Sequence, residues 1–181
     1  MNFPSIALLL LLLFFPPAGS VAMPSVLNKT NLIKAGEGKL TWFGLSIYNA
    51  SLWTSENAIY ANLYDSDVLL IADYDRNISN QRILNSISEE WKRINSQLGL
   101  NEQLWMSELD TIIPNILSGD KLSSFVRANG STKFYLNDQY IGEIQDPKFG
   151  PAFLSIWLNK KTSKKRLRKD LLGDLIQDDA P

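Results

Sequence analysis

The chain has 181 residues, with 18 Lys and Arg, 19 Asp and Glu, and a formal net charge of −1. It has no Cys and no His, which excludes thiol nucleophiles, Ser-His-Asp triads, Cys/His zinc sites and imidazole acid–base chemistry. The balanced charge argues against nucleic acid as a partner, and any catalysis would have to use other side chains or an oxygen-ligated metal.

The N-terminal segment Met1–Ala22 is typical of a secretory signal peptide. Its apolar run, Ile6–Phe15, has the length of a signal h-region and is too short to span a bilayer. Small residues end it at Ser20-Val21-Ala22, the pattern that signal peptidase accepts. We therefore expect cleavage after Ala22 and a periplasmic or secreted protein. An uncleaved interfacial anchor is the alternative, because no Lys or Arg precedes the apolar run.

The rest of the chain predicts one domain, residues 23–173, followed by a polar tail, residues 174–181. No later apolar run is long enough to cross a bilayer. We therefore expect no transmembrane segment in the mature chain.

Strand patterns dominate the first part of this domain. We expect a first strand and a loop over residues 23–37, with Gly36-Glu37-Gly38 as a turn. Lys39–Trp53 is predicted to be one long strand whose alternation slips near Phe43-Gly44, which indicates a bulge or a bend. Asp67–Arg76 is apolar on both faces, as expected for a central strand of a sheet that helices cover.

Two helices follow this strand. The first is expected to begin at the N-cap Ser79 and to end at Gly99. Its apolar stripe recurs at helical spacing: Ile83, Ile87, Trp91, Ile94 and Leu98. Asn101 is expected to cap the second helix, which Pro114 should end or kink.

The pattern then returns to strands and ends in helices. Three short strands are predicted at Asp120–Ala128, Thr132–Leu136 and Tyr140–Ile144, the first two joined by a hairpin turn at Asn129-Gly130. Asp146-Pro147 should open one helix, and a last helix should run from a Ser163 cap to Gly173. Strands and helices segregated in this way predict an α+β fold, an antiparallel sheet with helices on one face.

Aromatic side chains indicate where a ligand could bind. Trp42, Phe43 and Tyr48 lie in one strand region, and Trp91 and Trp105 lie on the helices expected to cover it. Such rings usually build a core, but a ring-lined cleft between a sheet and helices also holds small apolar ligands. Both interpretations stay open on the sequence alone.

Two charged patterns have a functional and a plain explanation. The pairs Asp65/Asp67 and Asp73/Asp75 could hold a divalent cation, but a polar turn and a strand edge explain them without further oxygen ligands, so we predict no metal. Seven of the 18 basic residues fall within ten positions. They could attract anionic lipid or an acidic partner, or form the solvated face of a helix whose leucines point inward: Lys160, Lys161, Lys164, Lys165, Arg166, Arg168 and Lys169.

Several segments together resemble the bacterial chalcone-isomerase-like proteins. They are Gly38–Trp53, Tyr74–Ser79, Gly119–Leu122, Phe134–Asn137, Ile141–Ile144, Asp146–Phe149, Phe153–Leu158 and Thr162-Ser163. The resemblance covers residues 35–173, and the order and spacing of the segments make it specific. It implies a chalcone-isomerase-like open-faced β-sandwich, with a large antiparallel sheet covered by a layer of helices.

The same resemblance bears on activity. Enzymes of this family close a flavanone ring with an arginine, a threonine, a tyrosine and a nearby asparagine. Here Phe43 stands at the position that resembles the threonine, no Tyr occurs between Tyr74 and Tyr135, and Asn28–Lys34 contains no Arg. No catalytic residue is therefore carried over, and an enzyme is not the favoured reading. Other family members bind fatty acids in the equivalent cleft without catalysis.

The favoured prediction is an exported, non-catalytic binder of a small apolar or amphipathic ligand, fatty-acid-like, that needs no cofactor. The predicted ligand-binding residues are polar contacts and aromatic walls: Tyr48, Tyr74, Arg76, Trp42, Phe43 and Trp91. One alternative is an isomerase or intramolecular lyase with a rearranged site. A second is an envelope protein-interaction module that uses the basic helix.

Overall fold

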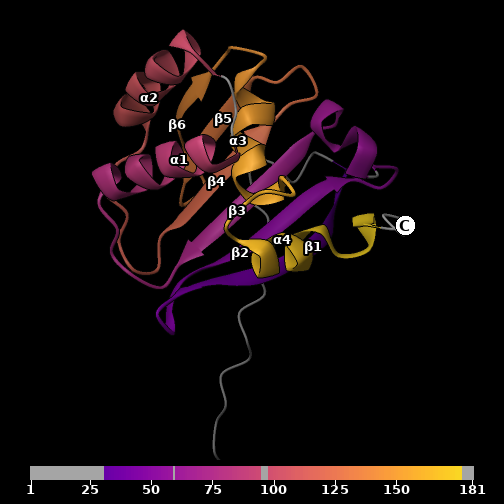
Figure 1. The fold of residues 1–181 in the computed structure, drawn as a ribbon, viewed down its shortest axis with the longest axis horizontal. Helices are drawn as coiled ribbons and strands as arrows, with labels where there is room; N and C mark the ends of the chain where they lie inside the picture. Colours follow the sequence, from indigo (N-terminus) through magenta and orange to yellow (C-terminus); the bar gives the residue numbers. More distant parts are fainter. Residues whose placement is uncertain (1–30, 59, 95–97, 177–181) are drawn as a thin grey trace, which may run out of the picture.

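The computed structural model describes residues 31–58, 60–94 and 98–176 (Figure 1). The predicted signal peptide Met1–Ala22 and its cleavage site lie outside these residues. Six strands form one antiparallel sheet in which sequence order and spatial order are the same. Their bounds are β1 (Leu32–Trp42), β2 (Leu45–Ser55), β3 (Val68–Tyr74), β4 (Lys121–Val126), β5 (Thr132–Leu136) and β6 (Gln139–Ile144).

The helices fall into two pairs. The first pair, α1 (Asn80–Ile94) and α2 (Leu100–Ile112), connects β3 to β4. The second pair, α3 (Phe149–Leu158) and α4 (Lys165–Leu172), follows β6. Figure 1 shows α1, α3 and α4 in front of one face of the sheet. Two short 3-10 helices complete the described fold, η2 (Tyr60–Asp65) between β2 and β3, and η3 (Gly173–Ile176) after α4. The predicted α+β class, an antiparallel sheet under a helical layer, is confirmed.

The main core lies between the sheet and the helices. Leu52 and Leu70 on the strands and Trp91 on α1 are among its buried side chains, as are the leucines of α4. A second, smaller cluster lies on the other face of the sheet and is built from Leu69, Ile71, Phe125 and Tyr135. The prediction that β3 is apolar on both faces is therefore confirmed.

The predicted turn at Gly36-Glu37-Gly38 is wrong, because all three residues lie inside β1. A Cβ atom on Gly36 would come within 2.3 Å of the Asp170 carbonyl oxygen, and one on Gly38 within 2.6 Å of the Asp170 Cβ. These glycines let α4 pack directly against β1. A glycine needed for close packing and a glycine needed for a turn look alike in a sequence.

The predicted single strand Lys39–Trp53 is also wrong, because it is a hairpin. Trp42 pairs with Leu45, and Phe43-Gly44 is the two-residue loop between β1 and β2. The φ angles of Phe43 and Gly44 are 46° and 76°, as a type I′ turn requires. A phenylalanine in this left-handed conformation is uncommon, so the sequence indicated only a bulge or a bend where the chain turns back.

Two of the predicted helix caps differ from the structure. Gly99, and not Asn101, stands at the N-cap of α2, and Lys164 stands at the N-cap of α4 in place of Ser163. The Ser79 hydroxyl does accept a hydrogen bond from the Arg82 N–H at 3.4 Å, as predicted for the first helix. Gly173 ends α4, and Leu175, in the predicted polar tail, packs against the core.

Candidate functional site

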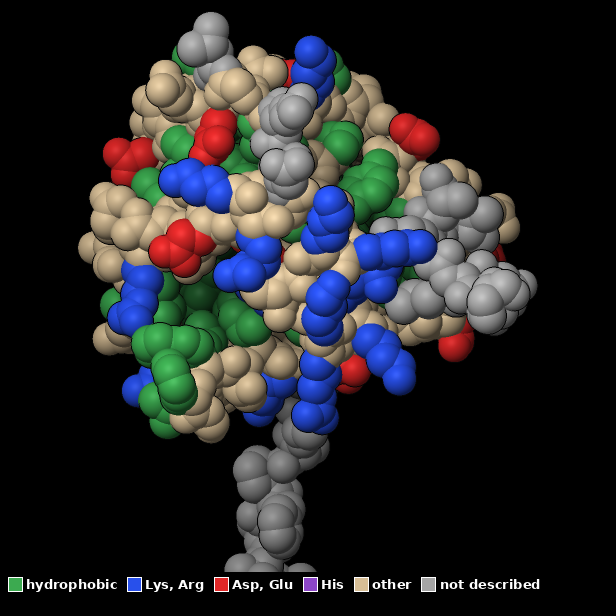
Figure 2. All heavy atoms as spheres, viewed as in Figure 1, with side chains coloured by type: hydrophobic (Ala, Val, Ile, Leu, Met, Phe, Trp, Pro, Cys, Tyr) green, Lys and Arg blue, Asp and Glu red, His purple; other side chains and the backbone are tan. Residues whose placement is uncertain are grey.

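A pocket of about 1070 Å³ lies between the sheet and the helical layer. Strands β2 and β3 contribute apolar side chains to its wall, and α1, α3 and α4 contribute the facing ones. Figure 2 shows hydrophobic side chains inside a hollow on this face of the molecule. The apolar residues that line it include Ile47, Leu70, Ala72, Ile83, Ile87, Phe153, Ile156 and Leu167.

Two tyrosines and a tryptophan form a polar feature in this apolar wall. The Trp157 indole N–H donates a hydrogen bond to the Tyr48 hydroxyl at 2.8 Å, and the Tyr48 and Tyr74 rings lie 5.3 Å apart. Burial raises the pKa of both tyrosines well above the usual value, although the bond from Trp157 acts in the opposite direction on Tyr48. Both side chains are therefore neutral phenols near pH 7. They can donate a hydrogen bond to a ligand oxygen, and they are poor general bases.

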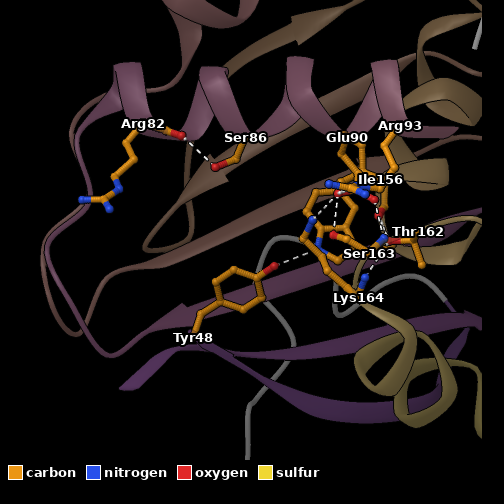
Figure 3. A network of polar contacts seen from close by, with 10 residues as sticks. Tyr48, Arg82, Ser86, Glu90, Arg93, Ile156, Thr162, Ser163 and Lys164 are labelled. Carbon is orange, nitrogen blue, oxygen red and sulfur yellow. Dashed lines mark hydrogen bonds and ion pairs between the residues drawn. The ribbon is translucent and has the colours of Figure 1, made fainter. Parts of the chain in front are cut away.

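A buried carboxylate joins α1 to the segment before α4. Glu90 is 4% exposed, and it accepts hydrogen bonds from the Ser163 backbone N–H at 2.6 Å, the Ser163 hydroxyl at 2.7 Å and the Lys164 ammonium at 3.0 Å (Figure 3). Burial alone would raise the pKa of Glu90, but the hydrogen bonds from Ser163 and the charge of Lys164 outweigh it and lower the pKa. Glu90 is therefore ionised, and it holds Lys164 at the edge of the pocket.

Basic side chains dominate the charged part of the pocket lining. Arg82 lies over the Trp42 ring, 5.4 Å from its centroid, and Arg93 lies 3.9 Å from the Glu90 carboxylate. Among the described residues, two acidic ones, Glu89 and Glu90, line the same pocket. We call the seven basic lining residues the basic rim: Lys39, Arg76, Arg82, Arg93, Lys164, Lys165 and Arg166. Cations beside an apolar wall favour a ligand that carries an anionic group.

Four of the six predicted ligand-binding residues line this pocket together: Tyr48, Tyr74, Arg76 and Trp42. Phe43 and Trp91 are not among the lining residues. Phe43 is 87% exposed at the tip of the β1–β2 turn. Trp91 is fully buried, with its indole N–H bonded to the Ala152 carbonyl oxygen at 2.8 Å and its ring 5.9 Å from Trp105. Trp91 therefore packs in the core instead of facing a ligand.

Arg82, Lys164 and Trp157 are among the pocket residues that the sequence did not predict. A signal existed for two of them. Arg82 stands beside Ile83 on the predicted amphipathic helix, and Trp157 follows Phe153 by four residues, the spacing of one helix face. The position of Lys164 follows from its pairing with Glu90, 74 residues away, and no local pattern encodes that contact.

The described part of the chain holds no group of three or more His, Cys, Asp or Glu side chains arranged to bind a metal ion. Two of the four aspartates considered for such a site have other partners. Asp67 accepts the Ala128 N–H at 2.8 Å, and Asp75 accepts a hydrogen bond from the Ser46 hydroxyl. None of the helices in the described ranges has the length and apolar character needed to cross a membrane.

Comparison with known proteins gives a family and a fold. Residues 21–173 match the model of a family described as chalcone isomerase-like. An uncharacterized protein of Haemophilus influenzae is 24% identical over 138 residues, which are 76% of this chain and 66% of that protein. The chain thus spans slightly less than two thirds of that relative's length.

A similar solved structure is the crystal structure of an Arabidopsis thaliana fatty-acid binding protein. It superposes with a TM-score of 0.64 at 9% sequence identity, over 80% of this chain and 88% of that one. At this identity the likeness shows a shared fold. It agrees with the open antiparallel sheet and helical layer described above.

Proposed function

This chain belongs to the chalcone isomerase-like family, and from that premise we propose that it binds, without converting it, a small amphipathic ligand with an apolar tail and an anionic head. Fatty acids are the ligand class that fits this description best. A fatty-acid binding protein with the same fold supports the choice. The single observation that carries the proposal is an apolar pocket bordered by a basic rim.

The size and lining of the pocket support an apolar tail. Ligand pockets for small molecules usually enclose about 300–1,000 Å³, and this pocket reaches about 1070 Å³. Burying the alkyl chain of a ligand against Ile47, Ile87 and Phe153 would contribute about 0.8 kcal/mol per methylene group. A long chain is therefore favoured over a small polar metabolite.

The basic rim supports an anionic head. Arg76 and Arg82 are exposed at the surface and border the pocket, and a guanidinium binds a carboxylate through two parallel hydrogen bonds. The Tyr48 hydroxyl accepts its bond from Trp157, so its own proton can be donated to a ligand oxygen. A ligand with its carboxylate at the rim and its tail directed inward would use both the basic rim and the Tyr48 hydroxyl.

The absence of the family's catalytic set supports binding over turnover. Phe43, at the position that resembles the catalytic threonine, lies at a solvent-exposed turn, and the buried tyrosines stay protonated near pH 7. An isomerase or lyase activity would need a proton acceptor other than Tyr48 or Tyr74. Turnover of any substrate in a panel of enones would overturn the non-catalytic part of the proposal.

Export is the remaining part of the proposal and depends on the sequence of Met1–Ala22 alone. We propose that signal peptidase cleaves after Ala22 and that the protein acts in the periplasm or outside the cell. Intact mass measurement of the protein recovered from a cell's periplasmic or culture fraction tests it. A chain starting at Met23 is expected, and a chain recovered with Met1 in the membrane fraction would contradict it.

Calorimetry with the chain from Met23 onward tests ligand binding. Palmitate is expected to bind, and hexadecanol, which has the same tail and no charge, to bind at least tenfold more weakly. Replacing both Arg76 and Arg82 by Gln should remove most of this difference. Lys92→Gln, on the same helix as Arg82 and outside the pocket lining, should leave it unchanged. No heat and no thermal shift with any fatty acid would overturn the proposal.

A further inference from the structure

The β1–β2 turn exposes an apolar surface beside the pocket. Trp42 is 55% exposed, Phe43 87% and Leu45 49%. We call these three residues the apolar tip. Two of them, Trp42 and Leu45, also line the pocket, so the tip borders the pocket mouth. Figure 2 shows hydrophobic side chains protruding next to the hollow.

Folding does not account for the residue at the end of this tip. Phe43 adopts a φ of 46°, a conformation in which Asn and Gly replace bulky residues in most hairpins. The centroid of its ring lies 4.9 Å from that of the Trp42 ring, and the rest of the side chain faces solvent. A large apolar side chain that is both strained and exposed indicates a surface made for contact with something apolar.

Exposed cations lie on the other side of the same pocket mouth. Lys165 and Arg166 line the pocket, and the Arg166 side chain is 94% exposed. Figure 2 shows Lys and Arg side chains gathered over the region of α4. We call the five exposed ones the basic patch: Lys160, Lys161, Lys165, Arg166 and Lys169. The leucines of α4 point inward, whereas Lys165, Arg166 and Lys169 are exposed on the helix. The acidic Asp170 lies 4.0 Å from Arg166 on the same helix, and the patch as a whole stays basic.

We infer that the apolar tip and the basic patch dock this protein on a membrane surface containing anionic lipids, with the pocket mouth toward the bilayer. Tryptophan and phenylalanine side chains partition into the headgroup boundary, and clustered Lys and Arg side chains are attracted to anionic lipid. The net charge of −1 does not oppose this, since exposed charges act over about 8 Å at physiological ionic strength and the local face is basic. A protein partner would need a surface that is apolar opposite the tip and acidic opposite α4, whereas an anionic bilayer offers both.

This docking goes beyond ligand binding and can be separated from it. A pocket mouth held against a bilayer would let an amphipathic ligand pass between membrane and protein without crossing water. The docking residues Phe43, Lys161 and Lys169 do not line the pocket, so their loss should leave binding of a ligand from solution intact. Filling the pocket should, conversely, leave docking intact.

Co-sedimentation with vesicles tests the inference, using the chain from Met23, which keeps every described residue. Phosphatidylcholine vesicles that contain about 30% of the anionic lipid phosphatidylglycerol are expected to pull down the protein. Pure phosphatidylcholine vesicles, which carry no net charge, are expected to pull down far less. Phe43→Asn should weaken binding about tenfold, as expected for losing one buried aromatic side chain. The double variant Lys161→Glu/Lys169→Glu, at two exposed positions outside the pocket lining, should weaken it at least as much, and added salt should reproduce that loss.

Matched variants on other parts of the surface serve as controls. Leu104→Asn removes an apolar side chain that is 64% exposed on α2, and Arg127→Glu/Lys148→Glu reverses two exposed charges outside the pocket lining. Both should bind vesicles as the parent chain does. Equal losses in the control and test variants, or a parent chain that stays in the supernatant with every vesicle, would overturn the inference. A parent chain that binds vesicles but no fatty acid would overturn the proposed function and leave the docking standing.

Discussion

Trp157 on α3 donates its indole N–H to the Tyr48 hydroxyl on β2 at 2.8 Å. This bond crosses from the helical layer to the sheet in the wall of the pocket, between residues 109 positions apart. It places a neutral hydroxyl among the apolar side chains of the lining. The same bond therefore contributes both to stability and to the polar contact that we propose for a ligand.

Tyr48→Phe is expected to lower the free energy of unfolding by about 1 kcal/mol, because the Trp157 N–H loses its acceptor in a partly buried place. Urea unfolding measures the change. Tyr74→Phe is the matched control, since it removes the neighbouring hydroxyl and leaves the Trp157 bond in place. A larger loss in the control than in Tyr48→Phe would contradict this role of the bond.

Glu90→Gln is expected to lower the free energy of unfolding by about 1.5–3 kcal/mol at neutral pH, the range for hydrogen bonds to a charged group. Glu89→Gln, at the exposed neighbouring position, should have little effect. The loss should depend on pH, because the pKa of Glu90 in the folded protein is held below its ordinary value of 4.5.

The sign of that dependence follows from linkage. A carboxyl whose pKa is lower in the folded state stabilises the protein fully above the unfolded value and loses this contribution as pH falls through the folded value. The difference between the parent chain and Glu90→Gln should therefore be constant from pH 7 down to about 5 and shrink below pH 4.5. Urea midpoints across this range measure it, and a difference that grows on acidification would contradict the assignment.

Ala72→Phe is expected to weaken ligand binding strongly without unfolding the protein. Ala72 lines the pocket from β3, where about 1070 Å³ can take a phenyl ring. Palmitate affinity should fall at least tenfold while the urea midpoint changes little. Ala72→Ser, nearly equal in volume to the parent residue, should bind normally. Full affinity in Ala72→Phe would place the ligand elsewhere.

Phe43→Asn is expected to stabilise the fold slightly. A non-glycine residue in the left-handed region costs about 1 kcal/mol, which Asn reduces, and the lost contact between the Phe43 and Trp42 rings offsets about half of that. The expected gain is about 0.5 kcal/mol in thermal or urea unfolding. A clear loss of stability would mean that the turn needs this ring for folding, against the argument for a docking surface.

Gly130→Ala and Gly119→Ala should differ sharply. Both glycines have positive φ angles, 86° and 91°. A Cβ on Gly130 would lie 1.8 Å from the Pro147 carbonyl oxygen, whereas one on Gly119 meets nothing within 4 Å. Gly119→Ala should cost about 1–2 kcal/mol, and Gly130→Ala about 3 kcal/mol or more because the backbone must also shift. Equal losses of stability in the two variants would show that the positive φ angle alone, and not the contact with Pro147, determines the effect at both sites.

Local periodicity in the sequence predicts much of the fold. The alternation in β3, the helical stripe of α1 and the Asn129-Gly130 turn each predict an element that the structure contains. Each depends on residues a few positions apart, so the sequence displays it directly. Chain order then suffices for the sheet, because neighbouring strands pair in sequence order.

The errors arose where one residue type serves two purposes. Gly36 and Gly38 resemble turn residues, yet they provide room for Asp170 on α4. Phe43 resembles a strand residue, yet it occupies a left-handed turn position. Ser163 resembles a helix cap, and its hydroxyl bonds to Glu90 instead. The deciding contact in the glycine and serine cases comes from a distant element.

The sequence by itself determined the class of the fold, the order of its elements, the family resemblance and the lack of thiol and imidazole chemistry. It also identified Tyr48, Tyr74 and Trp42 on the strands, and Arg76 shortly after β3, as candidate ligand contacts, and these four residues line the pocket. Only the tertiary structure decided that Trp91 belongs to the core and that Arg82 and Lys164 join a basic rim. The physical reason is distance along the chain: a helix face is a local property, whereas the partner that buries it or leaves it open is set by packing between segments tens of residues apart.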